Sequence, residues 1–343
     1  MQNRNSYIDF FKGISCIAVI LIHCRFPGIV GGTFRAIARF AVPFFFSVSG
    51  YFLYASDQYL SIQTVRVRLK KTITLLVSAE LFYVLYYIVI NVCISRVSFN
   101  AILENFTMSK LMRLIIDNSP MLYPHLWYVF ALIYCYVFIA FIEFNGHRWR
   151  NLYCIIAFGY YILFSEILPK FGIYDTFTSW QISIHNTFFV RALPFVFLGA
   201  IIREYENEIR KVSISPIRAY VCFFTLCLTS VFERLLFSDS GVYLSSIALV
   251  LLFWIVSINK ICRVNESIAF IGNRLSTTVY IVHIAVMNTL DMVYLSFGIE
   301  KNPVVAWIRP VAVIFLSLIP GLIPLWSENI ISVILVLLNL LFV

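Results

Sequence analysis

The sequence predicts an all-α fold, a polytopic membrane helix bundle of about ten transmembrane helices. Of its 343 residues, 61% are hydrophobic and only 13% are charged, whereas soluble domains have about 45–50% and about 25%. The 33 Phe and 20 Tyr are spread through apolar runs of membrane-spanning length. No soluble domain, linker or internal repeat interrupts these runs. We therefore expect one integral membrane domain over residues 1–343.

The expected spans follow from the length of each apolar run, because a hydrocarbon core about 30 Å thick needs about 20 helical residues. Runs of about that length occur in order at 7–24, 36–54, 73–94, 126–143, 152–168, 186–202, 219–236, 242–258, 276–296 and 304–322. A further run, 328–343, follows Pro320, Pro324 and a polar stretch. It is either an eleventh span or a helix that lies along the membrane interface.

The distribution of basic residues predicts a cytoplasmic N-terminus. With that orientation, 15 of the 26 Lys and Arg fall in cytoplasmic segments, 7 fall in external segments and 4 fall within spans. Cytoplasmic loops carry an excess of Lys and Arg. We therefore attribute the formal charge of +9 to basic residues that set the topology and face anionic lipid headgroups, rather than to a nucleic-acid partner. None of the eight cysteines forms a C-x-x-C pair, so we expect no zinc site or other metal site.

His23 is the first candidate for chemistry, because a titratable side chain within a span is costly and is functional by default. It lies eleven residues after Lys12 in the first span, which is about three helical turns or ~16 Å. The two side chains therefore share nearly one face, where a long anionic ligand could bind. The alternative is a snorkelling lysine and a histidine that hydrogen-bonds a neighbouring helix.

A basic cluster precedes the third span on the same expected side as Lys12. It comprises Arg66, Arg68, Lys70 and Lys71. These residues could signal topology alone. They could also bind phosphate, since arginine forms bidentate contacts with phosphate oxygens and lysine acts as a point charge.

Further polar groups enter spans from the external side or lie inside them. They are His125, Trp127, Tyr128, Arg191, Tyr280 and His283. Trp127 and Tyr128 fit an interfacial aromatic belt, which does not require the neighbouring histidine. A buried arginine such as Arg191 needs a partner or an anionic ligand. The sequence has no P-loop, no G-x-S-x-G elbow and no H-E-x-x-H pair, which leaves membrane-embedded histidine chemistry or transport.

Taken together, these residues resemble the membrane acyltransferase-3 family, whose members O-acylate surface glycans. The resemblance rests on residues 8–13 with His23, and on the segments 42–51, 125–128, 191–199 and 280–283, in the family's order. Lys12 stands where the family usually has arginine. The R-x-x-R motif that the family has before its third span corresponds here to Arg68-Leu69-Lys70-Lys71. Both changes keep the charge but lose the bidentate geometry of arginine.

The resemblance implies a bacterial inner-membrane O-acyltransferase that uses cytoplasmic acyl-CoA, most simply acetyl-CoA, as co-substrate with no bound cofactor. The acceptor would be a hydroxyl of an extracytoplasmic glycan or glycolipid. His23 occupies the family's presumed catalytic position, as a base or as the carrier of an acyl-histidine intermediate. The donor would bind Lys12, Arg66, Arg68 and Lys71, and the other polar groups of the spans would line the acceptor side.

A transporter is the main alternative function. The runs 41–46 and 125–128 also resemble the membrane module of the serine racemases of glycopeptide resistance. A protein of that kind would move a small solute such as an amino acid without acyl-CoA. A structural or assembly subunit is a third possibility, for which substitutions of the histidines would have no effect.

Overall fold

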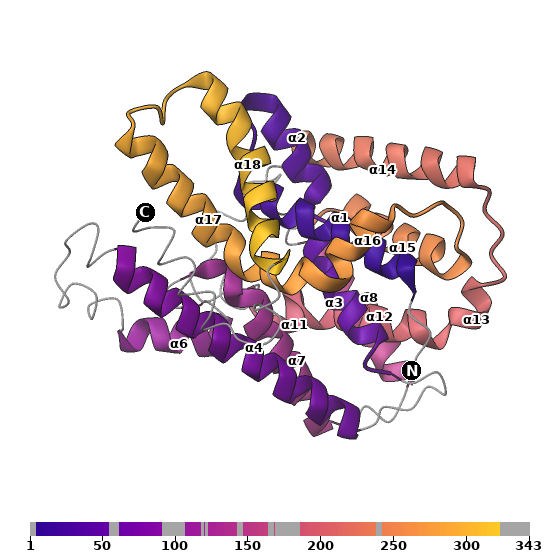
Figure 1. The fold of residues 1–343 in the computed structure, drawn as a ribbon. Helices are drawn as coiled ribbons and strands as arrows, with labels where there is room; N and C mark the ends of the chain where they lie inside the picture. The colour runs from indigo at the N-terminus through magenta and orange to yellow at the C-terminus, as the bar shows by residue number, and fades with distance from the viewer. Residues whose placement is uncertain are drawn as a thin grey trace.

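The computed structural model describes residues 5–54, 62–90, 107–117, 120, 123–142, 147–163, 168, 186–237 and 242–322. These parts of the chain form helices and no strand, which confirms the all-α class (Figure 1). The helices are α1 (Ser6–His23), α2 (Gly28–Ala38), α3 (Ala41–Tyr51), α4 (Ile62–Ile88), α6 (Met108–Asp117), α7 (Trp127–Ile142), α8 (His147–Ile162), α11 (Phe188–Arg191), α12 (Leu193–Glu204), α13 (Glu206–Ile209), α14 (Pro216–Phe237), α15 (Leu244–Asn259), α16 (Glu266–Phe270), α17 (Ser276–Ser296) and α18 (Pro303–Leu322). A 3₁₀ turn, η2 (Pro124–Leu126), precedes α7, and a π-helical turn, η5 (Ile271–Leu275), joins α16 to α17.

Seven helical segments of the described residues are long and apolar enough to cross a membrane. They are Ser6–His23, Gly28–Tyr51, Ile62–Ile88, Pro124–Phe141, Pro216–Leu236, Glu266–Ser296 and Pro303–Leu322. The expected count of ten is not confirmed. The other three expected spans correspond to α8, to α11 with α12, and to α15, whose helices of 16, 4, 12 and 16 residues are each shorter than the about 20 that a span needs. Residues 328–343 lie outside the described part of the chain.

Helix α1 lies at the centre of the bundle, in contact with α2, α3, α15, α16, η5, α17 and α18. Its N-terminus is capped by Asn5, whose side-chain oxygen accepts a hydrogen bond from the backbone N–H of Tyr7 at 3.0 Å. It ends at His23, and Pro27 precedes the next helix. Residues at either end of α1 therefore reach several neighbouring helices.

Glycines allow two very close helix crossings. Gly13 of α1 lies against the backbone of Ile268 in α16, and Gly272 of η5 lies against the backbone of Asp9 and Gly13 in α1, so that a Cβ on either glycine would collide. Gly50 of α3 and Gly199 of α12 meet in the same way. The π-helical turn lies at the first crossing, and single π-helical turns are frequent at functional sites.

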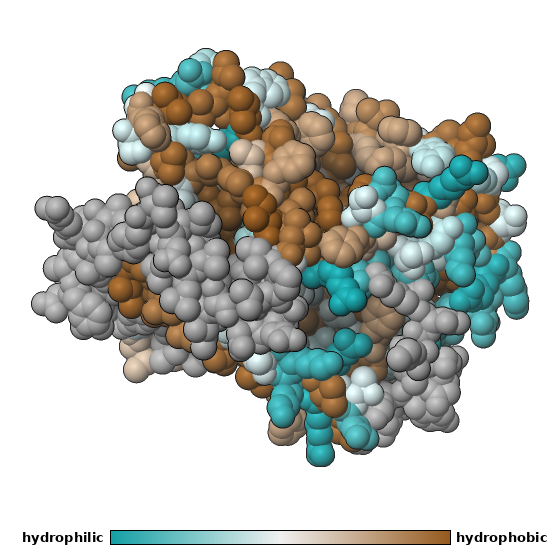
Figure 2. All heavy atoms as spheres, in the orientation of Figure 1, coloured by the Kyte–Doolittle hydropathy of each residue, from teal (hydrophilic) through white to brown (hydrophobic). Residues whose placement is uncertain are grey.

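The surface divides into an apolar part and a polar end. Figure 2 shows apolar side chains over α17 and α18, whereas hydrophilic side chains gather around α13. The exposed apolar side chains, such as Leu228 and Phe232 on α14 and Phe315 on α18, suit contact with lipid. Together with the seven helical segments that are long and apolar enough to cross a membrane, this surface fits an integral membrane protein.

Candidate functional site

Three histidines from distant parts of the sequence meet inside the bundle. His23 ends α1, His125 lies in η2 and His283 lies on α17. The ring centroids of His23 and His283 are 5.3 Å apart, and those of His125 and His283 are 5.2 Å apart. We call these three side chains the histidine cluster. His283 is its central member.

The hydrogen bonds of His283 define which of its ring nitrogens can accept a proton. Its Nδ1 lies 3.1 Å from the carbonyl oxygen of Val279 and 2.9 Å from that of Tyr280. A nitrogen that faces two carbonyl oxygens acts as a donor, so Nδ1 carries the proton and Nε2 keeps its lone pair. This Nε2 is buried and has no hydrogen-bond partner among the described residues. His283 therefore presents a buried acceptor inside the cluster.

Accessibility differs within the cluster. His283 and His125 are buried, with 1% and 4% of their surface exposed. His23 is exposed at the end of α1. The cluster therefore connects the interior of the bundle with the surface at that end.

Tyrosines fix the buried part of the cluster in place. The Tyr280 hydroxyl donates a hydrogen bond to the backbone carbonyl of His125 at 2.6 Å. Tyr83 of α4 donates to the carbonyl of Ile281 at 2.5 Å, and its ring meets the His125 ring edge-on at 5.0 Å. These bonds tie α4, η2 and α17 together around the histidines.

A cavity of about 720 Å³ leads toward the cluster from the polar end. Along α1 it is lined by Lys12 and by Val19, which are seven residues or ~10 Å apart. Tyr128 and Tyr280 also line it. His23 lies one turn beyond Val19, just as His283 lies one turn beyond Tyr280. The cavity therefore stops one helical turn, about 5 Å, short of the histidine cluster.

The charges that line the cavity favour an anionic ligand. Among the described residues, four cations, Lys12, Arg68, Arg203 and Arg210, line it with two carboxylates, Asp9 and Glu206. The Lys12 ammonium lies 3.4 Å from the Asp9 carboxylate. The net positive charge would attract phosphate or carboxylate groups.

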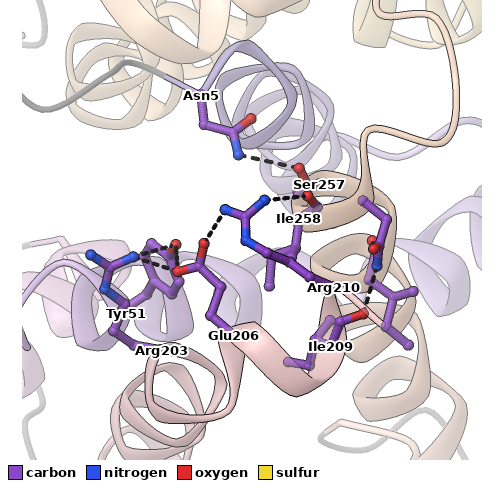
Figure 3. A network of polar contacts seen from close by, with 10 residues as sticks. Asn5, Tyr51, Arg203, Glu206, Ile209, Arg210, Ser257 and Ile258 are labelled. Carbon is purple, nitrogen blue, oxygen red and sulfur yellow. Dashed lines mark hydrogen bonds and ion pairs between the residues drawn. The ribbon is translucent and has the colours of Figure 1, made fainter. Parts of the chain in front are cut away.

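Glu206 organises two of these cations, as Figure 3 shows. It accepts a hydrogen bond from the Tyr51 hydroxyl at 2.6 Å and forms ion pairs with Arg203 and Arg210. Arg203 also donates to the Tyr51 oxygen at 2.9 Å. Burial alone would raise the pKa of Glu206, but the Tyr51 bond and the two arginines outweigh it and hold the pKa below its ordinary value. Glu206 is therefore ionised and keeps both guanidinium groups at the cavity.

The structure brings together most of the residues that the sequence singled out. His23, His125 and His283 form the histidine cluster. The other residues that reach the site are lining residues of the cavity, namely Lys12, Arg68, Tyr128 and Tyr280. The donor-side and histidine-side candidates thus lie along one path.

Four other candidates lie apart from the cavity lining. Arg66 and Lys71 are exposed on α4. Trp127 packs against the core, with its ring centroid 5.8 Å from that of Phe46. Arg191 ends α11, and its Nε is buried without a hydrogen-bond partner among the described residues. Among those residues, no group of three or more His, Cys, Asp or Glu is arranged to hold a metal ion.

Sequence reasoning missed the group formed by Arg203, Glu206 and Arg210. It counted the two arginines only as signals of topology. Their spacing of three and four residues around a glutamate was the available signal, because residues three and four apart are neighbours on a helix. What the sequence did not reveal is that this segment turns toward α3, where Tyr51 completes the group.

Comparison with known proteins identifies a family. An acyltransferase-3 family model, described as an acyltransferase domain, matches residues 5–326, nearly the whole chain. No curated protein and no solved structure matches the chain.

Proposed function

The chain belongs to the acyltransferase-3 family, and on that premise we propose that it transfers an acyl group from acyl-CoA to a hydroxyl of a glycan. Acetyl is the simplest acyl group for this reaction. The observation that carries the proposal is the cavity, which has a surplus of cations at its polar end and stops one turn from the histidine cluster. The polar end would face the bacterial cytoplasm, and the acceptor would be extracytoplasmic.

The cavity supports a donor role for its cations. Lys12 and Arg68 would bind the phosphates of CoA, together with Arg203 and Arg210. The pantetheine arm would then run along α1 past Val19, which brings the thioester toward His23. The distance of ~16 Å between Lys12 and His23 along the helix suits such an extended arm. Arg66 and Lys71, exposed on α4 beside this path, would add attraction at longer range.

The reaction needs a base for the acceptor hydroxyl. We propose that His23 takes the hydroxyl proton while the oxygen attacks the thioester carbonyl carbon. The carbon–sulfur bond then breaks, and the thiolate of CoA receives the proton from His23. Histidine suits this exchange, since its ordinary pKa of about 6.5 lies close to neutral pH. The exposed position of His23 supports access of a hydroxyl from the end opposite Lys12.

Binding of acetyl-CoA tests the donor half of the proposal. We expect acetyl-CoA to raise the unfolding temperature of the purified protein. A ligand at 100 times its Kd stabilises the folded state by about 2.7 kcal/mol. Absence of a shift with any acyl-CoA would contradict the proposal. It would favour the transporter. Movement of an amino acid into liposomes that contain the protein, in the absence of acyl-CoA, would then establish transport.

Transfer of a labelled acetyl group tests the catalytic half. Membranes that contain the protein should move label from acetyl-CoA into a glycan fraction, and His23→Ala should abolish this while acetyl-CoA still stabilises the variant. Removal of a general base costs about 10²–10⁴-fold in rate. Undiminished product from His23→Ala would show that another group acts as the base.

A further inference from the structure

The inner end of the cavity contains three side chains that each lie one helical turn from a member of the histidine cluster. Val19 precedes the histidine of α1 by four residues, Tyr280 precedes that of α17 by three, and Tyr128 follows that of η2 by three. All three side chains line the cavity, whereas the histidines do not. We call Val19, Tyr128 and Tyr280 the cavity floor.

The cavity floor lies between the cations of the cavity and the histidines. On α1 the lining residues Lys12 and Val19 both precede the histidine, and on α17 the lining residue Thr277 precedes Tyr280. On α7 the lining instead continues away from η2, to Leu132. A ligand that enters at the cations therefore meets the floor before it meets a histidine.

Contacts with several helices hold the floor in position. The rings of Tyr128 and Tyr280 meet edge-on, with their centroids 5.5 Å apart. The Tyr280 hydroxyl donates to the backbone carbonyl of His125 at 2.6 Å, and the Tyr128 ring packs against Phe46 with a centroid distance of 4.5 Å. Val19 is buried in the same core cluster. Close-packed side chains of this kind resist displacement, so the space between them has a defined size.

The floor and the lining beside it are apolar or aromatic. Phe45 and Val129 line the cavity next to Tyr128, and the Phe45 ring meets the Tyr128 ring edge-on at 6.3 Å. The cavity thus has cations at one end and an apolar surface at the other. An apolar pocket distinguishes chains that differ by one methylene about 10–200-fold. The floor can therefore select an acyl chain by its length.

The gap between the floor and the histidines matches the space that a reacting hydroxyl needs. A base lies about 3 Å from the hydroxyl oxygen whose proton it takes, and that oxygen lies about 3 Å from the carbon it attacks. One helical turn of about 5 Å accommodates both distances at an angle. A thioester carbonyl at the floor would thus be within reach of a hydroxyl bound to His23.

We propose that the cavity floor limits the transferred acyl chain to the length of an acetyl group, which packs against Val19 and the rings of Tyr128 and Tyr280. This inference rests on the proposed acyl transfer and names its acyl class. A longer chain would occupy the space of the acceptor hydroxyl, or would hold the thioester carbonyl back from the floor. In either case the carbonyl could not reach the hydroxyl at His23.

Binding of a series of acyl-CoA molecules tests the proposal without requiring turnover. CoA, acetyl-CoA, propionyl-CoA and butyryl-CoA would be titrated against the purified protein in lipid nanodiscs. We expect the wild type to bind acetyl-CoA about tenfold more tightly than butyryl-CoA or better. Equal dissociation constants for acetyl-CoA and butyryl-CoA would overturn the proposal.

Reciprocal substitutions of Val19 locate the selection. Val19→Ala removes two methyl groups from the floor and should bind butyryl-CoA about as tightly as acetyl-CoA. Val19→Ile adds a methyl group and should weaken the binding of acetyl-CoA about tenfold, while the binding of CoA stays unchanged. Ile17→Ala is the matched control, because Ile17 lies about 200° around α1 from Val19 and does not line the cavity.

The control should keep the wild-type preference for acetyl-CoA. A preference that survives Val19→Ala, in a variant that still binds CoA, would overturn the proposal. Should Val19→Ala fail to bind CoA, Val19→Ile decides, since a wild-type ratio of acetyl-CoA to CoA binding in that variant would likewise overturn it.

The same titrations separate this proposal from the proposed function. A wild type that binds no acyl-CoA would overturn both. Binding of all acyl-CoA molecules with one affinity would leave the donor role intact and overturn the selection by the floor. A preference for acetyl-CoA that follows Val19, in a protein that transfers no acetyl group, would support the floor as a binding site for a short acyl chain and contradict the transfer.

Discussion

The imidazole rings of His23 and His283 lie beside each other across α1 and α17, with their centroids 5.3 Å apart. The orientation of the His283 ring is fixed by its own helix, since its Nδ1 donates to the carbonyl oxygens of Val279 and Tyr280. This leaves Nε2 as the nitrogen that can accept a hydrogen bond. A His23 ring oriented by such an acceptor would present its other nitrogen to a substrate, as a positioned base requires.

We therefore expect substitution of His283 to slow acyl transfer without weakening the binding of acetyl-CoA. His283→Asn keeps a donor near the carbonyl of Tyr280 but removes the Nε2 acceptor, and should lower kcat about 10²-fold. The KM for acetyl-CoA should remain as in the wild type, because His283 does not line the cavity. A merely structural role would instead lower stability and raise KM together. An unchanged kcat in a folded His283→Asn protein would contradict this prediction.

The basic residues of α1 and α4 should differ in their effect on acetyl-CoA binding. Lys12→Ala and Arg68→Ala each remove a cation that lines the cavity, and each should weaken binding about tenfold. Arg66→Ala and Lys71→Ala remove exposed cations from outside the lining, and each should change the Kd less than threefold. Isothermal titration of the four variants would check this. Equal effects of all four would indicate that only their summed charge matters.

The positions of these cations show how far the sequence could predict the site. The cost of titratable groups in spans directed attention to His23, His125 and His283, and the structure brings their rings together. The basic cluster before the third span contains four cations, and the sequence alone does not show which of them bind a ligand. On a helix, Arg68 shares a face with Thr72 and Leu75, four and seven residues on, and these three line the cavity. Arg66 lies about 200° around the helix from Arg68, so it faces elsewhere.

Other features depended on tertiary contacts that no single segment encodes. Apolar length alone does not determine where a helix ends, and the spans expected at α8 and α15, which have 16 residues each in the described part of the chain, are not confirmed. No local pattern predicts the close contact of Gly32. It forms with Arg234, 202 residues later in the sequence, whose guanidinium occupies the place that a side chain at Gly32 would take.

Glu206 should contribute stability that depends on pH. Its folded-state pKa lies below the ordinary value of 4.5, so its ion pairs stabilise the protein above that pH and are lost as the pH falls through the lowered value. Glu206→Gln should lower the free energy of unfolding by about 1–3 kcal/mol at neutral pH, because Arg203 loses its partner in a half-buried site.

The measurement is the unfolding temperature in detergent between about pH 7 and pH 4. The wild type should lose more stability over this range than Glu206→Gln does. Parallel curves for the two proteins would mean that Glu206 does not carry this pH dependence. Glu208→Gln is the control, since Glu208 is an exposed carboxylate of the same short helix.

The crossing of α3 and α12 should tolerate no added side chain. A Cβ on Gly199 would collide with the Ser47 carbonyl and the Tyr51 N–H, so α3 would have to move. Ser47 also accepts a hydrogen bond from Trp254 at 2.9 Å, which links the crossing to α15. Gly199→Ala should therefore destabilise the protein by about 2 kcal/mol or more, as overpacking of a tight contact does.

Gly159→Ala provides the matched control for this crossing. Gly159 lies within α8, and a Cβ there would meet nothing within 4 Å. Alanine is favoured over glycine inside a helix by roughly 0.5–1 kcal/mol, so this variant should be as stable as the wild type or more stable. The two unfolding temperatures, measured in the same detergent, should thus shift in opposite directions. A Gly199→Ala protein as stable as Gly159→Ala would show that α3 can shift without cost. The cavity wall that α3 forms with Phe45 and Ser49 would then be adaptable rather than fixed.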